Sequence, residues 1–306
     1  MEKIILWVGF NLFVLGLLAL DLGVFHRGTR VIKLKEALVW SIIWTVLALV
    51  FNAAVYFWGG REKAFQFFTG YLIERSLSVD NIFVFLIIFS YFRLPAAYQH
   101  KVLFWGILGA LVARAIFIFS GVALIGKFHW MIYVFGAFLV VTGVKMILQK
   151  GQSVKVDKNP ILRLCRRFLP LSEHYDEARF FTMQNGRRIA TPLFVVLLVI
   201  EATDVLFAAD SIPAILAITL DPFIVYSSNV FAILGLRAMY FALAGTAEMF
   251  HYLHYGVSLV LVFVGVKMLV SGILEMPIEV TLGAIAGILL VSVVASLVKP
   301  ARIQAG

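Results

Sequence analysis

The feature that most constrains this chain of 306 residues is a series of nine apolar stretches, each near the ~20 residues that a helix needs to cross a bilayer. Hydrophobic residues make up 62% of the chain and charged residues 14%, against about 25% charged in soluble proteins. The runs are continuous rather than alternating, which disfavours a β-barrel. We predict an all-α polytopic membrane protein with about nine transmembrane helices. The predicted spans are 4–25, 37–58, 66–91, 101–125, 130–149, 190–218, 222–245, 255–273 and 277–298.

The distribution of Lys and Arg predicts the orientation. With the N-terminus outside, the inward segments carry 17 Lys and Arg residues and the outward segments carry 4. Cytoplasmic loops are enriched in these residues, so we expect the N-terminus outside and the C-terminus in the cytoplasm. The net charge of +9 could indicate nucleic acid, but its concentration in alternate loops is a membrane-topology signal, so no nucleic-acid partner is expected.

The chain contains an internal repeat. The acidic segment that begins at Glu74 matches the one at Asp204 with an offset of 130 residues. The segments 103–110 and 230–237 share the string ILG, at 107–109 and 233–235, with an offset of 126, and the two GVKM strings match with an offset of 122. Each copy has three spans, and an odd number gives the copies opposite orientations, as in the inverted repeats of secondary transporters. We divide the chain into two N-terminal helices (1–63), repeat 1 (64–150), a basic cytoplasmic loop (151–189), repeat 2 (190–273) and a C-terminal helix with its tail (274–306).

Five carboxylates lie inside the third and sixth spans. Each charge at mid-membrane costs roughly 2.5–3.5 kcal/mol, so five unpaired ones would cost on the order of 15 kcal/mol. They must therefore meet a metal cation, a proton or a buried basic side chain. The five are Glu74, Asp80, Glu201, Asp204 and Asp210.

Helical geometry places some of these groups on shared faces. Glu74, Ser78 and Asn81 share one face of a regular helix, while Asp80 points elsewhere. In the second copy, Asp204 and Ser211 form the matching stripe. Because the sequences around Asp80–Asn81 and Asp210–Pro213 are poor helix interiors, we expect a break at each, which would turn both carboxylates inward.

The available ligands are hard oxygens, because the six histidines fall in loops or at helix ends and the single cysteine, Cys165, lies in the basic loop. Such ligands favour Mg²⁺, Ca²⁺ or Mn²⁺. Without metal, some of the carboxyl groups should hold protons, which makes metal/proton exchange natural. The candidate ligands are Glu74, Asp80, Asn81, Glu201, Asp204, Asp210 and Ser211, with Ser78, Arg114, Arg237 and Asp21 in supporting roles.

Other readings of these residues stay open. The acids could form ion pairs with Arg75, Arg114 and Arg237, although three arginines cannot offset five acids. Asp21 is either an interfacial cap or a ligand where metal enters. Asn229 is either a site oxygen or a helix–helix hydrogen bond. The repeated lysines at 145 and 267 are expected to extend toward the membrane surface.

The loop 150–189 is either a solvated basic loop or a regulatory element. Residues 159–168 (NPILRLCRRF) can form a short basic amphipathic helix on the inner leaflet. Asn185-Gly186 lies between short extended runs, which indicates a β-hairpin. We find no phosphate loop, zincin pattern or nucleophile elbow, so we do not expect an enzyme.

Two acidic segments, ERSLSVDN (74–81) and EATDVLFAADSIP (201–213), and the strings ALDLGVFHR (19–27) and SNVFAILGLRAMYF (228–241) resemble the TerC family, most closely its Alx-type branch. The resemblance extends over nearly the whole chain, and the two acidic segments are its most specific matches. The resemblance implies a multi-pass protein of the bacterial inner membrane, in the LysE-like transporter superfamily, that exports Mn²⁺ along a path lined by the five acids. Mn²⁺ would be the transported ion, protons and lipid its other partners, and no cofactor would be bound permanently.

Two other functions remain possible on the sequence. Ca²⁺ shares the ligand chemistry of Mn²⁺, so a Ca²⁺ exporter or a general divalent-cation exporter or channel is the first. The second is a non-transporting scaffold linked to metal loading or tellurium resistance, for which the loop 150–189 would supply the partner surface.

Overall fold

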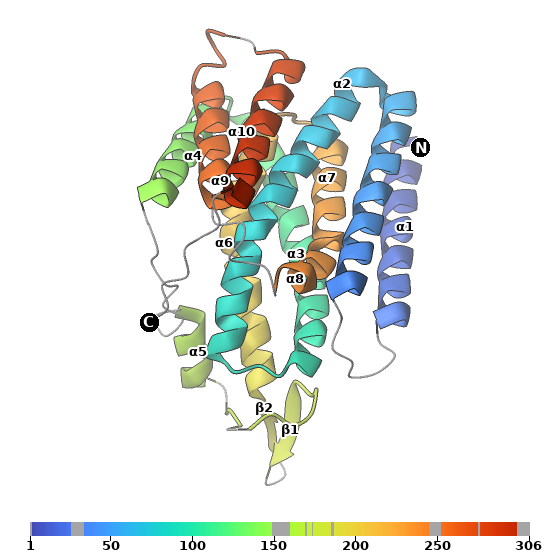
Figure 1. The fold of residues 1–306 in the computed structure, drawn as a ribbon, viewed down its shortest axis with the longest axis vertical. Coiled ribbons are helices and arrows are strands. Elements are labelled where there is room, and N and C mark those ends of the chain that lie inside the picture. Colours follow the sequence, from blue (N-terminus) through green and yellow to red (C-terminus); the bar gives the residue numbers. More distant parts are fainter. Residues whose placement is uncertain are drawn as a thin grey trace.

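The structure is a computed structural model that describes residues 2–25, 34–148, 160–168, 170–172, 174–184, 187–244, 252–274 and 276–298. Six of its helices are long and apolar enough to cross a membrane, and two more apolar helices are shorter. Figure 1 shows these helices side by side, with a small hairpin at one end, so the chain is an all-α polytopic membrane protein. The elements are α1 (Glu2–Phe25), α2 (Leu34–Tyr91), α3 (Ala96–Lys127), α4 (Met131–Leu148), α5 (Pro160–Phe168), β1 (Phe181–Gln184), β2 (Arg187–Ala190), α6 (Pro192–Leu216), α7 (Pro222–Leu234), α8 (Leu236–Leu243), α9 (Leu253–Leu269) and α10 (Ile278–Val298).

The second and third predicted spans both lie within α2, which reverses direction at its top in Figure 1. The reversal falls at Gly60, whose φ of 85° and ψ of 173° are readily adopted only by glycine. The 58 residues of α2 therefore form two antiparallel arms. The second arm, 61–91, carries the first acidic segment.

The breaks expected at the acids are wrong. Within α2 the only non-helical dihedral angles are at Gly60, and α6 continues through Pro213 to Leu216. Pro213 lies within four residues of the end of α6, so its missing N–H affects only the last turn. Instead, the break falls at Gly235, which separates α7 from α8 inside a single predicted span.

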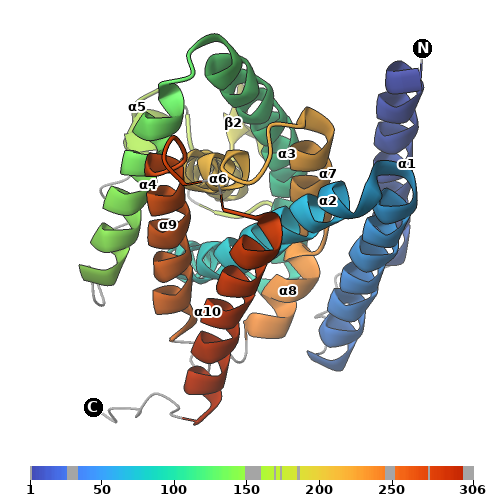
Figure 2. The same cartoon turned by 90° about the horizontal axis from the view of Figure 1, so that it is seen from above.

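Figure 2 places α6 in the middle of the bundle and α1 at its edge. The second arm of α2 packs on α7, α3 packs on α6, and α4 packs extensively on α9. Tight glycine contacts join the last pair, since a Cβ at Gly136 would lie 2.9 Å from the carbonyl oxygen of Gly265. Aromatic rings attach α1 to α7, with the Phe10 and Phe223 centroids 5.3 Å apart.

Both structural predictions for the basic loop are confirmed where it is described. The nine residues of α5 match the predicted helix, and β1 pairs antiparallel with β2 in the register Gln184–Arg187. The segment before the hairpin is attached to the bundle. Tyr175 donates a hydrogen bond to the carbonyl of Phe92 (2.9 Å), and Lys101 donates to the carbonyl of Ala178 (2.6 Å).

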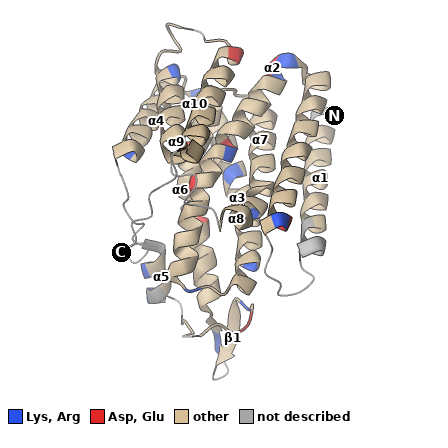
Figure 3. Ribbon diagram, viewed as in Figure 1, with Lys and Arg blue, Asp and Glu red and all other residues tan. Residues whose placement is uncertain are grey.

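Charged residues are rare along the helices and more frequent at their ends and in the loop, as Figure 3 shows. This distribution and the apolar exterior fit an integral membrane protein that crosses the bilayer several times.

Candidate functional site

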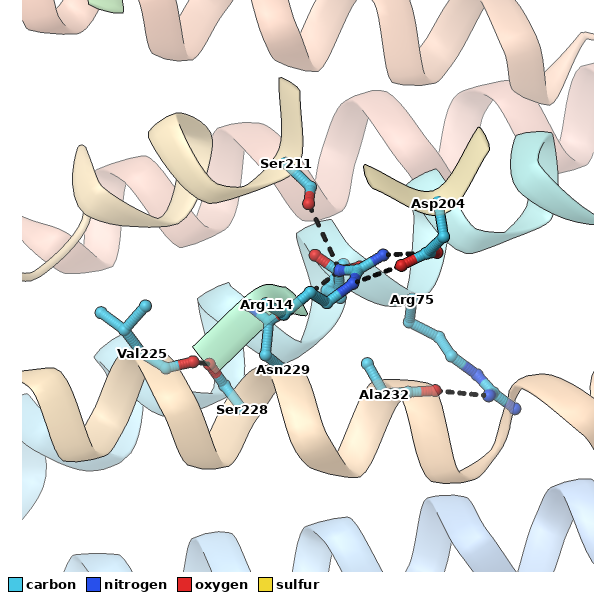
Figure 4. Close-up of polar contacts among 9 residues, drawn as sticks. Arg75, Arg114, Asp204, Ser211, Val225, Ser228, Asn229 and Ala232 are labelled. Carbon is cyan, nitrogen blue, oxygen red and sulfur yellow. Dashed lines mark hydrogen bonds and ion pairs between the residues drawn. The ribbon is translucent and has the colours of Figure 1, made fainter. Parts of the chain in front are cut away.

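Arg114 of α3 is the centre of a buried polar cluster in the middle of the bundle (Figure 4). Its guanidinium donates two hydrogen bonds to Asp204, from Nε to Oδ2 (3.3 Å) and from Nη2 to Oδ1 (3.2 Å). Its Nη1 donates to the Asn229 amide oxygen (2.8 Å), to the Ser211 hydroxyl (3.3 Å) and to a carboxylate oxygen of Glu74. We call these five residues the Arg114 cluster.

The cluster brings four helices together. Glu74 comes from the second arm of α2, Arg114 from α3, Asp204 and Ser211 from α6, and Asn229 from α7. Asp204 and Ser211 are seven residues apart, two helical turns, so a regular α6 presents both to the same neighbours. Every member is at least 97% buried, which excludes bulk water from the ion pairs.

The charges and hydrogen bonds of the Arg114 cluster do not balance. Two carboxylates, if ionised, face one guanidinium, which leaves one negative charge. The second carboxylate oxygen of Glu74 and the amide nitrogen of Asn229 are buried and have no hydrogen-bond partner among the described residues. Buried polar atoms are nearly always paired, so these two mark a place where the cluster can accept a further group.

Glu201 lies beside Asp204 on α6 and points at α3. Its carboxyl group occupies the space above Gly109, where any Cβ would collide with it. The glycine is therefore required for this close approach. Glu201 is partly buried and lies near the Arg114 cluster, about one helical turn before Asp204.

Asp80 lies apart from the Arg114 cluster. Its carboxylate is 3.3 Å from Nδ1 of His254, the second residue of α9, and Nε2 of the same ring is 3.1 Å from the Met146 carbonyl near the end of α4. The expectation that imidazole would be kept from the acids is wrong here. His254 does lie at a helix end, but that end packs against α2 where Asp80 emerges.

Asp210 also leaves the stripe, because α6 is regular. It lies beside Thr142, with Lys145 in electrostatic range, both on α4. The expectation that this lysine only extends toward the membrane surface therefore misses a second role. Its counterpart Lys267 points its Nζ at the Ala217 carbonyl, 3.5 Å away.

The remaining candidates are distributed around these groups. Asn81 and Ser78 are buried on α2, Arg237 is buried in α8, and the side chain of Asp21 lies outside the described residues. Arg75 points away from Glu74, as expected from adjacency. It donates to Ser41 (2.9 Å) and to the Ala232 carbonyl (3.5 Å), next to Gly235.

Across the described part of the chain, no three His, Cys, Asp or Glu side chains gather closely enough to hold a metal ion. Two of the five acids share Arg114, and the other three lie at separate positions. The alternative that the acids form ion pairs with arginine is therefore confirmed for Glu74 and Asp204. The assignment of the full set as a metal path stays a prediction.

Sequence reasoning gave Asn229 only a secondary place and did not select His254 or Thr142. Asn229 could have been found as the one carboxamide of α7, a helix of the second copy that otherwise carries apolar residues, one tyrosine and two serines. The other two depend on how α4 and α9 sit against α2 and α6, which no local pattern encodes.

Comparisons with known proteins agree on one family. The family described as "Integral membrane protein TerC family" matches residues 59–304. A Myxococcus xanthus protein named "Uncharacterized membrane protein STKORF319" is 59% identical over 294 residues, covering 96% of this chain and 92% of that protein. The Escherichia coli K12 protein named "Putative membrane-bound redox modulator Alx" is 49% identical over 297 residues, covering 94% and 92%. No solved structure gives a significant match.

Proposed function

Because this chain belongs to the TerC family of integral membrane proteins, we propose that it is a secondary transporter and not an enzyme. It exports Mn²⁺ from the cytoplasm across the bacterial inner membrane, in exchange for protons. The observation that carries the proposal is the Arg114 cluster, in which oxygen ligands from three helices converge on one buried cation.

The chemistry of the cluster supports a divalent cation. Two carboxylates, an amide oxygen and a hydroxyl are the hard ligands that Mn²⁺, Mg²⁺ and Ca²⁺ prefer. In this conformation the guanidinium of Arg114 takes the place that the metal would take. If a divalent ion took the place of the Arg114 guanidinium, its charge would balance the two charges of Glu74 and Asp204. The oxygen of Glu74 that now accepts no hydrogen bond could then bind the ion.

Helix packing supports the inverted repeat that we propose for this transporter. The first helix of copy 1 (α2) packs on the second of copy 2 (α7), and the reverse pair, α3 with α6, packs as well. The third helices, α4 and α9, pack on each other. The Arg114 cluster lies where the two copies meet, which is the usual place for a transporter site. The nine spans and the N-outside orientation belong to the same proposal.

The test is metal flux into proteoliposomes that contain the purified protein and a Mn²⁺-sensitive dye. We expect Mn²⁺ movement to respond to an imposed pH step. Asp204→Asn removes one charged ligand and should slow flux on the order of tenfold, a change of ~1.4 kcal/mol. Glu62→Gln, at an exposed carboxylate near the turn of α2, is the matched control and should transport normally. Wild-type flux by Asp204→Asn would refute the site.

The same assay separates the alternatives. A Ca²⁺ or general divalent-cation exporter would move Ca²⁺ as fast as Mn²⁺, and a channel would show flux that ignores the pH step. A scaffold would show no flux at all. The name of the Alx relative refers to redox modulation. In this chain, however, burial in α5 raises the pKa of the Cys165 thiol and keeps it in its less reactive form, so we assign it no redox role.

A further inference from the structure

The contacts between α4 and α9 stay the same when each residue is replaced by its counterpart in the other copy, an operation that we call exchange. With the offset of 122, Gly136 corresponds to Ser258 and Gly143 to Gly265. A Cβ at Gly136 would meet the Gly265 carbonyl at 2.9 Å, and one at Gly143 would meet the Ser258 carbonyl at 2.7 Å. Exchange turns the first contact into the second, so the pair keeps its internal packing.

The contact between α2 and α6 is also preserved by the exchange. A Cβ at Gly70 of α2 would lie 3.3 Å from Ile215 of α6. With the offset of 130, the exchanged contact joins Ile200 to Phe85, and these two side chains line one small cavity. The core helices therefore also keep their mutual arrangement under exchange.

The position of the α4–α9 pair along this core differs between the two copies: the residues that face Asp80 and Asp210 are not counterparts. His254 faces Asp80, so its counterpart Ile132 should face Asp210. Thr142 stands there instead, ten residues further along α4. The groove that contains Phe138, Ala209 and Ile212 supports this alignment of α4 with α6. The pair is thus displaced by five residues, ~7 Å, from the position in which the halves would match.

Helix lengths show the same ten-residue difference. With the offset of 126, the first residue of α3, Ala96, corresponds to Pro222, the first residue of α7. The end of α3 at Lys127 corresponds to residue 253, whereas α8 ends at Leu243, ten residues earlier, with 245–251 outside the described residues. The extra turns of α3 lead directly into α4, so they match the displacement of α4 in size and place.

We propose that the α4–α9 pair slides as one body along the core, and that the exchanged arrangement is a second stable state. In that state Asp80 faces Val264, Asp210 faces Ile132, and residues 118–127 no longer extend α3. Ten residues of travel correspond to ~15 Å. Two copies of one fold give two states of similar energy, which is the basis of alternating access. The role of this slide in transport rests on the proposed function, whereas the slide itself is inferred from helix packing alone.

The sliding surface suits this motion. The groove between α4, α6 and α3 is almost wholly apolar, with Ser120 as its only polar side chain, so few hydrogen bonds must break in this groove. Outside it, the slide must break the contacts of His254 with Asp80, of Thr142 with Asp210 and of Lys267 with the Ala217 carbonyl. By contrast, the glycine contacts hold α4 to α9 through backbone atoms. The apolar groove is therefore the interface that must slip, and the α4–α9 interface is the one that must stay fixed.

The test is disulfide cross-linking in membranes, in a full-length Cys165→Ala background with a protease site inserted in 149–159. A cross-link then holds two fragments together on a gel. Asp80→Cys with His254→Cys reports the present state, and Asp80→Cys with Val264→Cys reports the second. Asp80→Cys with Leu259→Cys is the control, because Leu259 is 48% exposed on the outer face of α9.

We expect the 80–254 and 80–264 pairs to cross-link and the 80–259 pair to stay as two fragments. Asp210→Cys with Thr142→Cys or Ile132→Cys gives the same comparison in the other copy, in case one variant fails to fold. Absence of both 80–264 and 132–210 cross-links, with 80–254 present, would overturn the slide. Cross-links of both states, together with no Mn²⁺ flux by the wild-type protein, would instead keep the slide and refute the transport function.

Discussion

Replacing Arg114 with glutamine should destabilise the protein in metal-free buffer. The wild-type side chain is 2% exposed and holds Asp204 at 3.2 Å. Two unit charges at that distance attract by about 5 kcal/mol at an effective dielectric constant of about 20. Desolvation offsets much of this in the native protein, but removing one partner leaves the other charges buried and unpaired, at a cost of about 3–5 kcal/mol.

Mn²⁺ should reverse this loss if the cluster is a cation site. Arg114→Gln leaves Glu74 and Asp204 facing an empty position, and a divalent ion there would neutralise both. A ligand at one hundred times its Kd stabilises the folded state by about 2.7 kcal/mol, most of the expected deficit. The assay is the unfolding temperature of detergent-purified protein, with and without Mn²⁺. The wild type should respond less, because its guanidinium competes with the metal.

Arg237→Gln is the matched control, because Arg237 is also 2% exposed and lies outside the Arg114 cluster. It should lower the unfolding temperature without gaining a larger response to Mn²⁺. Equal Mn²⁺ shifts in the wild type and both variants would show that the vacated position is no cation site. Unchanged stability of Arg114→Gln in metal-free buffer would refute the estimated cost of leaving the buried carboxylates unpaired.

Two further substitutions test local contacts. Gly109→Ala places a Cβ where the Glu201 carboxyl group lies, so Mn²⁺ flux should fall severalfold, whereas Gly16→Ala on α1 has open space and should transport normally. Tyr175→Phe removes the hydrogen bond to the Phe92 carbonyl, worth about 1 kcal/mol, and should speed trypsin cleavage of the segment before the hairpin. Burial raises the pKa of Tyr175 to about 12, so the wild-type contact should be complete below pH ~10 and lost as the pH rises through about 12.

The membrane class, the approximate spans and the hairpin were predictable because each depends on local pattern. Apolar length alone identifies the helices, and Asn185-Gly186 between extended runs identifies the turn. Helical spacing also separated Asp80 from the Glu74 stripe correctly for a regular helix. The wrong step was to expect a break there, because burial against neighbouring helices outweighs the weak intrinsic preference of Ser, Asp and Asn.

The partners of the acids could not be predicted, because they depend on the relative position of helices far apart in sequence. Arg114 was recognised as a counter-ion, yet nothing local shows that it serves Glu74 and Asp204 together. Likewise, His254 reaches Asp80 only because α9 sits where it does along the core. A slide of the kind proposed above would change these pairs without changing any residue.

At one pair of matched glycines, the two copies of the sequence repeat meet side chains of opposite charge. Gly109 and Gly235 correspond in the two copies, and each leaves room for a charged side chain from the opposite copy. At Gly109 that side chain is the carboxyl group of Glu201, and at Gly235 it is the guanidinium of Arg75. The carboxyl group of Glu201 should attract a cation near Gly109, whereas the guanidinium of Arg75 should repel one near Gly235. If the two halves exchange their arrangements as proposed, this difference in charge should make the two states differ in their affinity for a divalent ion.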